Sequence, residues 1–305
     1  MKNSTSFSNN REQLTYAADI CRNIKCSLIF FFYCIFFFSS FAQETSTAPA
    51  GNLFIIGGGN RSPELMKQMI AIAQLASKDY IAILPMASAE PDSSFYYIKK
   101  DLQMVCSNTI AYLNFTQSNI NNRKWLDSLQ HAKLIFITGG DQSRFMKAVL
   151  HTPVYDAIHK AYNAGATIAG TSAGAAVISR YMITGNQLTS DTVYHETFDK
   201  LRINNIEFEE GLGLLDSVII DQHFIVRSRY IRLVSALAQH PSFTCIGIDE
   251  ATAIVVHRRK ITVAGEGQVV LIKNPDLLNI TANGLIKFND LQISIFTAGD
   301  SFDLK

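Results

Sequence analysis

The sequence of 305 residues has little excess charge of either sign. Charged residues make up 17% of the chain, and its 27 Lys and Arg residues nearly balance its 26 Asp and Glu residues. No block of like charge interrupts residues 52–305. A chain of this kind lacks the basic surface that binds nucleic acid or an anionic membrane. We therefore expect neither partner.

Long apolar runs are also missing. The run "SLIFFFYCIFFF" has about a dozen residues, whereas a membrane-spanning helix needs about 20. Scattered basic residues precede this run, and the small residues of "SSFAQE" follow it. That order is typical of a secretory signal, which predicts that residues 1–42 are removed by cleavage after Ala42 and that the protein is exported, periplasmic or extracellular. An uncleaved membrane anchor formed by residues 27–41 is the alternative.

Cysteine is scarce, with five residues, three of which lie in the predicted leader. The remaining two, Cys106 and Cys245, either pair in an oxidising compartment or lie in the core as reduced thiols. In both cases the fold does not depend on a disulfide framework. The mature chain has a formal charge of −1, because the leader carries four basic and two acidic residues.

From residue 52 onward, short apolar runs alternate with amphipathic stretches. This alternation indicates parallel strands that helices cover on both faces. After residue 242 the pattern changes to short strands joined by Gly and basic turns. We predict a short linker at 43–51, then a single α/β domain at 52–305 with a mostly parallel central sheet, helices on both faces, and antiparallel strands toward the C-terminus. The main predicted strands are 52–57, 80–86, 109–113, 133–140, 166–170 and 216–224, and the predicted helices are 63–77, 93–106, 121–131, 142–150, 153–165 and 227–239.

Five chemically suggestive clusters follow predicted strands. Because ligands bind outside the carboxyl ends of the strands in such sheets, we expect the clusters to converge on one edge. The first, "GGGNRS", lacks the third glycine and the later acidic residue of a dinucleotide site, so it indicates a tight turn that lines a pocket. The clusters are "GGGN" (57–60), "GGDQ" (139–142), "GTSAG" (170–174), "DQHF" (221–224) and "DE" (249–250).

The cluster "GTSAG" matches the G-x-S-x-G turn that raises a nucleophilic serine above a sheet. A helix N-cap at Ser172, or glycines that serve only as packing spacers, are the alternatives. A nucleophilic serine also needs a base, a group that orients the base, and amide donors for the oxyanion. His223 is the candidate base, since among the seven histidines it alone lies at a predicted strand end with a helix after it.

The orienting carboxylate is expected from "CIGIDEA", where Asp249 and Glu250 point to opposite faces of a strand, so that only one can face His223. This pattern leaves the choice open. Asp221 also competes, but it lies two residues from His223 in an extended segment. The oxyanion donors are expected to be the backbone N–H groups of Ala173 and Gly140. The order Ser, His, acid differs from the order Ser, acid, His of α/β-hydrolases.

The block "DQHFIVRSRYIRL" carries Arg227, Arg229 and Arg232, whose spacing does not form a single helix stripe. At least one of them is therefore expected to project toward the pocket or a partner segment. A planar guanidinium suits carboxylate recognition, which indicates an acidic group on the substrate.

The chain resembles the cyanophycinases over about residues 52–272. The resemblance rests on "GGDQ", "GTSAGA", this His–Arg block and "GIDEATA", which follow one another in the order found in that family. The cyanophycinases are serine peptidases of family S51, related to aspartyl dipeptidases, with a class I glutamine amidotransferase-like fold. The resemblance implies that Ser172 is the nucleophile, His223 the base and Glu250 the orienting acid. It also implies roles in substrate recognition or pocket building for Gln142, Asp221, Gln222, Arg227, Arg229 and Arg232.

The resemblance further implies a substrate, cyanophycin, which is a polyaspartate chain with arginines on its side-chain carboxyls. Its cleavage yields β-aspartyl-arginine dipeptides. A homodimer without metal or cofactor is expected. The long polar segment 181–212, which lies between the serine and the histidine, is a candidate lid and leaves the substrate preference open. Hydrolysis of aspartyl or isoaspartyl dipeptides, and a non-catalytic binding protein on the same scaffold, are the alternatives.

Overall fold

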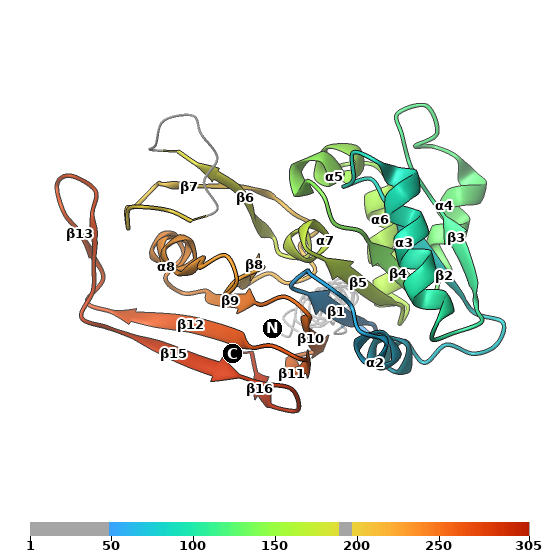
Figure 1. The fold of residues 1–305 in the computed structure, drawn as a ribbon. Helices are drawn as coiled ribbons and strands as arrows, with labels where there is room; N and C mark the ends of the chain where they lie inside the picture. Colours follow the sequence, from blue (N-terminus) through green and yellow to red (C-terminus); the bar gives the residue numbers. More distant parts are fainter. Residues whose placement is uncertain (1–48, 189–196, 305) are drawn as a thin grey trace, which may run out of the picture. The chain divides into compact units, whose positions relative to one another are not determined.

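The computed structural model describes residues 49–188 and 197–304 (Figure 1). The predicted leader, residues 43–48 of the predicted linker, and residues 189–196 of segment 181–212 lie outside the described residues. The described residues belong to one compact unit. Within the described ranges, no helix has both the length and the apolar character needed to cross a membrane.

The larger sheet has eight strands in the order β16-β11-β10-β1-β5-β4-β2-β3 (Figure 1). In the parallel part of this sheet, β1 pairs with β5. Both strands are buried on their two faces, as is typical of parallel strands that helices cover on both sides. The C-terminal strands β10, β11 and β16 pair antiparallel at the other side. The predicted α/β class is therefore confirmed. The strands are β1 (Asn52–Ile56), β2 (Tyr80–Leu84), β3 (Thr109–Tyr112), β4 (Leu134–Ile137), β5 (Thr167–Thr171), β10 (Thr252–His257), β11 (Lys260–Gly265) and β16 (Ser301–Asp303).

Helices cover both faces of this sheet. Alternate side chains of β1 enter two separate cores, with Leu53 and Ile55 in one and Phe54 and Ile56 in the other. The first core contains residues of α4 to α7, and the second contains residues of α2 and α3. The helices are α2 (Pro63–Ala73), α3 (Pro91–Gln103), α4 (Arg123–Gln130), α5 (Gln142–Val149), α6 (Pro153–Asn163), α7 (Ala173–Ala176) and α8 (Tyr230–Gln239).

All six predicted helices are longer than the observed ones, and for α2 and α8 a left-handed residue explains the difference. Helix α2 ends at Ala73 because Gln74 adopts φ 51°, which stops the helix before the predicted residue 77. Helix α8 begins at Tyr230 and not at residue 227, because Ser228 adopts φ 51°.

A second sheet has the order β15-β12-β9-β8 and packs against α8 (Figure 1). The sequence pattern did not separate it from the central sheet. Strand β8 ends where β1 ends, since the His223 N–H donates to the Gly57 carbonyl at 2.8 Å. The two sheets thus bring their chemically active ends together. The remaining strands are β6 (Tyr181–Gln187), β7 (Ile206–Glu210), β8 (Val218–Gln222), β9 (Thr244–Ile248), β12 (Val269–Asp276), β13 (Asn279–Ile280), β14 (Ile286–Lys287) and β15 (Asp290–Phe296).

Segment 181–212 contributes β6 and β7, which pair antiparallel. This pair stands beside the site, as described below. Cys106 and Cys245 are free thiols that belong to different cores. The structure therefore agrees with the reduced alternative, and burial raises the pKa of both thiols.

Candidate active site

Ser172 occupies the sharp turn between β5 and α7 with φ 54° and ψ −112°, a strained conformation for any residue but glycine. The flanking glycines make this turn possible. A Cβ on Gly170 would lie 2.0 Å from the Gly174 carbonyl oxygen, and one on Gly174 would lie 2.3 Å from the Ile137 carbonyl oxygen. Ser172 makes no side-chain cap hydrogen bond to α7, so its hydroxyl does not serve as an N-cap.

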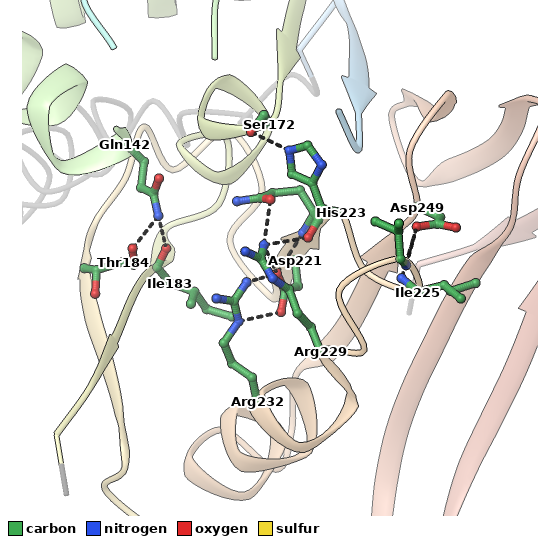
Figure 2. A network of polar contacts seen from close by, with 12 residues as sticks. Gln142, Ser172, Ile183, Thr184, Asp221, His223, Ile225, Arg229, Arg232 and Asp249 are labelled. Carbon is green, nitrogen blue, oxygen red and sulfur yellow. Dashed lines mark hydrogen bonds and ion pairs between the residues drawn. The ribbon is translucent and has the colours of Figure 1, made fainter. Parts of the chain in front are cut away.

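The hydroxyl instead meets a histidine. Ser172 Oγ lies 2.8 Å from His223 Nε2 (Figure 2), and His223 Nδ1 lies 2.5 Å from Glu250 Oε1. With Nδ1 protonated and donating to the carboxylate, Nε2 is free to accept the hydroxyl proton. The His223 side chain is 11% exposed. This geometry is that of a serine nucleophile with a positioned base.

Asp249 does not face the imidazole. Its Oδ1 accepts from the backbone N–H groups of Ile225 and Val226 at 3.1 Å each (Figure 2), which holds the loop after β8 in place. Of the two carboxylates that the strand pattern left open, Glu250 is therefore the one in contact with His223.

Burial lowers the pKa of His223 below its ordinary value of 6.5, and the nearby Arg227 and Arg229 guanidinium groups lower it further. The hydrogen bond and the charge of Glu250 oppose this shift. With burial the largest cause, the ring is neutral at neutral pH and can accept a proton.

The glycine turn after β1 leaves room for the His–Glu pair. A Cβ on Gly58 would lie 2.3 Å from His223 Cε1, and a Cβ on Gly59 would lie 2.7 Å from the Glu250 Cβ. The sequence predicted a tight turn here, and the structure adds the reason for its glycines. They let the backbone approach the imidazole and the carboxylate closely.

Peptidase family S51 is the family whose model matches this chain, at residues 53–264. The chain belongs to this family. Cyanophycinases of Trichormus variabilis and a Nostoc species are each 33% identical to it over 273 residues, which cover 86% of this chain and 87% of theirs. The cyanophycinase of Geminocystis herdmanii is 30% identical over 74% of this chain and 82% of its own. The chain is therefore a serine-type peptidase of cyanophycinase type.

Solved structures agree with the fold. A peptidase from an acI-B1 Actinobacterium superposes with a TM-score of 0.63 at 22% identity, covering 84% of this chain and 98% of that one. A putative peptidase E from Listeria monocytogenes superposes with a TM-score of 0.50 at 16% identity, covering 71% and 99%. At these identities the likeness concerns the fold alone.

In this S51 peptidase, a cavity of about 490 Å³ opens beside Ser172, and we call it the main cavity. Five of the six expected substrate or pocket residues line it: Gln142, Gln222, Arg227, Arg229 and Arg232. The sixth, Asp221, is 1% exposed and does not line the cavity within the described part of the chain. Asp221 supports the wall from behind.

The Asp221 carboxylate binds two buried arginines of the cavity wall (Figure 2). Its Oδ2 accepts from Arg232 Nε at 2.9 Å, its Oδ1 accepts from Arg232 Nη2, and Arg229 Nη1 lies 3.6 Å away. Arg229 Nη1 also donates to the Gln222 carbonyl and to Gln222 Oε1 at 2.7 Å each. This network compensates the buried charges and fixes the end of β8.

The opposite wall comes from the β6–β7 pair. Gln142 Nε2 donates to the carbonyls of Ile183 and Thr184 at 3.0 and 2.6 Å, which ties α5 to β6 (Figure 2). Glu207 Oε2 accepts from Thr184 Oγ1 and from Asn186 Nδ2 at 2.7 Å each. Thr184, Asn186 and Glu207 were not among the predicted site residues, although the alternation in "IEFEE" indicates that Glu207 and Glu209 share one face of a strand.

The two expected oxyanion donors come from the loop after β4 and from the start of α7. Gly140 lines the main cavity with φ +140°, and a Cβ there would lie 2.2 Å from the Ala87 carbonyl oxygen. Ala173 is the first residue of α7. Among the described residues neither N–H has a backbone acceptor. The described residues also contain no cluster of three or more His, Cys, Asp or Glu side chains suited to a metal ion.

Proposed function

We propose that this S51 peptidase hydrolyses cyanophycin to β-aspartyl-arginine dipeptides through a Ser172–His223–Glu250 triad and an acyl-enzyme. The observation that carries the proposal is the continuous pair of contacts from Ser172 Oγ to His223 Nε2 and from His223 Nδ1 to Glu250, with Ser172 at the wall of the main cavity. The names of the relatives, all cyanophycinases, support the substrate class.

In the first half of the reaction, Ser172 Oγ attacks the substrate carbonyl carbon while His223 Nε2 takes its proton. Glu250 accepts the Nδ1–H hydrogen bond and stabilises the imidazolium that forms. The N–H groups of Ala173 and Gly140 stabilise the oxyanion. His223 then gives its proton to the leaving nitrogen, the C–N bond breaks, and the acyl group stays on Ser172. Water repeats the attack with the same base and restores the hydroxyl.

The charges of the main cavity fit a substrate with both signs. Arg227, Arg229 and Arg232 line one wall, and Glu207 and Glu209 line another. The carboxylates of cyanophycin suit the arginines of the cavity wall, and its guanidinium groups suit Glu207. Two donors, Thr184 Oγ1 and Asn186 Nδ2, orient one oxygen of the Glu207 carboxylate.

We also propose that the protein is exported after removal of residues 1–42 and acts as a homodimer, as the sequence and the family resemblance suggest. An exported enzyme suits the use of polymer from outside the cell. Intact mass of the secreted protein tests the cleavage, and an N-terminus other than residue 43 contradicts the site. Light scattering of the eluting peak tests the dimer, and a monomer mass contradicts it.

The substrate is tested by incubating purified residues 43–305 with cyanophycin and identifying the products by mass. We expect β-aspartyl-arginine dipeptides, and no product above background from Ser172→Ala. Short aspartyl and isoaspartyl dipeptides, incubated in parallel, test the alternative substrates. If the enzyme cleaves these dipeptides and does not cleave the polymer, the cyanophycin assignment is overturned. The proposed triad is unaffected by that result.

A further inference from the structure

A second hollow meets the main cavity at Ser172. It has a volume of about 330 Å³ and lies between the glycine turn 57–59 and α3, and we call it the α3 groove. Ser172 lines both hollows. His223 lines the α3 groove, whereas the described wall of the main cavity does not include it. Gly140, the expected oxyanion donor, lines the main cavity. The nucleophile thus stands at a junction with its base on one side.

This division assigns the two halves of the substrate. When the scissile peptide bond lies over Ser172 Oγ, the acyl portion and the leaving portion of the substrate extend from it in different directions. The proton that left Ser172 Oγ is carried on His223 Nε2 and must reach the leaving nitrogen as the C–N bond breaks. The leaving nitrogen therefore lies on the His223 side, at the α3 groove. The acyl portion then extends into the main cavity.

We propose that the α3 groove is the binding site for the leaving peptide segment, and that Tyr97 is the residue that selects it. This inference rests on the proposed function, because it takes Ser172 as nucleophile and His223 as proton donor. It assigns a specificity role to α3, a helix that the site motifs do not include.

The placement of Tyr97 follows from the way α3 is fastened. Ser94, Tyr97, Ile98 and Asp101 lie on one face of α3 by their spacing of three and four. Asp101 Oδ2 accepts from Arg61 Nε and Nη2 at 3.0 and 2.9 Å, and Arg61 Nη1 donates to the Gly59 carbonyl at 3.3 Å. These contacts hold the helix against the glycine turn that packs against the His–Glu pair.

The chemistry of the groove differs from that of the main cavity. Its charged residue Arg61 is paired with Asp101, so its charge is compensated. Tyr97 presents an exposed aromatic side chain, 62% accessible, beside Ile98. An aromatic ring here contacts the planar peptide or guanidinium groups of the leaving segment by stacking. Recognition on this side is therefore expected to depend on the ring more than on charge.

The neighbouring Tyr96 is a matched control. It is also 62% exposed, its ring centroid lies 5.8 Å from that of Tyr97, and it is not part of the described wall of either hollow. Replacing Tyr96 removes the same aromatic group from the same helix without changing the groove wall.

The test uses two substrates that share a blocked β-aspartyl-arginine acyl portion. In one, the main-chain aspartyl carboxyl is joined to a second β-aspartyl-arginine unit, and in the other it carries a methyl ester. We expect Tyr97→Ala to lower kcat/KM for the two-unit substrate about tenfold more than for the ester. Tyr97→Phe should restore most of this difference, and Tyr96→Ala should change the ratio by less than about twofold.

Equal losses on both substrates in Tyr97→Ala, or the same change of ratio in Tyr96→Ala, overturn the inference alone. Wild-type enzyme that cleaves neither substrate overturns the proposed function and the inference with it. The two failures are thus distinguishable in the wild-type measurement.

Discussion

Gly58→Ala is the substitution whose effect can be worked out most directly from the structure. The new Cβ would lie 2.3 Å from His223 Cε1, whereas ordinary contacts begin at 3.4 Å, so the imidazole must move by about 1 Å. A misplacement of about 1 Å can lower the rate about 100-fold. Gly58 also has φ +115°, which a residue with a side chain adopts at a cost of about 1–3 kcal/mol.

Gly299→Ala separates the two effects. Gly299 has φ +92°, but a Cβ there would meet no atom within 4 Å. Both variants should lose about 1–3 kcal/mol of the free energy of unfolding to the left-handed backbone, measured by urea denaturation, and Gly58→Ala should lose more because its Cβ also clashes with the imidazole. Only Gly58→Ala should lose activity, with kcat/KM about 100-fold lower. Gly58→Ala with more than half of the wild-type kcat/KM, or Gly299→Ala with the same loss, would refute the role given to the glycine turn.

Three further predictions concern charges around the site. Arg227→Gln removes a positive charge that lowers the pKa of His223, so the pKa of His223 should rise in this variant. The acid limb of the profile of kcat/KM against pH should then move to higher pH. A limb that stays in place or moves to lower pH contradicts this prediction. Glu207→Gln should raise KM about tenfold for an arginyl substrate and leave KM for its neutral citrulline analogue unchanged, while equal effects on both contradict the assignment. Asp221→Asn leaves buried guanidinium charge without its carboxylate and should lower the free energy of unfolding in urea by about 3–5 kcal/mol. The matched Asp216→Asn, which removes an exposed ion pair, should change it by less than about 1 kcal/mol, and similar values for the two variants would contradict the account.

The elements of the parallel sheet were predictable because each buried strand is an uninterrupted apolar run. The strand predicted at 80–86 and the helix predicted at 93–106 show this, since both elements form, at Tyr80–Leu84 and Pro91–Gln103, with ends that differ by up to three residues. The separation of β8 into a second sheet was not predictable, because an apolar run does not record which strand it pairs with. Its partner β9 lies more than 20 residues away in the sequence.

The site was predictable to the extent that its chemistry follows strand ends. The turn at Ser172 and the strand end at His223 carry local signals, and the structure brings both side chains together. The strand pattern alone left Asp249 and Glu250 open, because both residues lie between β9 and β10, where the alternation of a strand no longer decides which carboxylate faces the imidazole. The burial of Asp221 against Arg232 also depends on long-range packing of α8 on β8, which no local pattern encodes.

Trapping the acyl-enzyme tests the central claim most directly. The enzyme is mixed with the blocked β-aspartyl-arginine methyl ester, quenched in acid within the first turnover, digested, and mapped by peptide mass. The account predicts that the acyl mass is found on Ser172, and that Ser172→Ala carries none and releases no product. An acyl group on another residue, or wild-type product release by Ser172→Ala, would contradict the account.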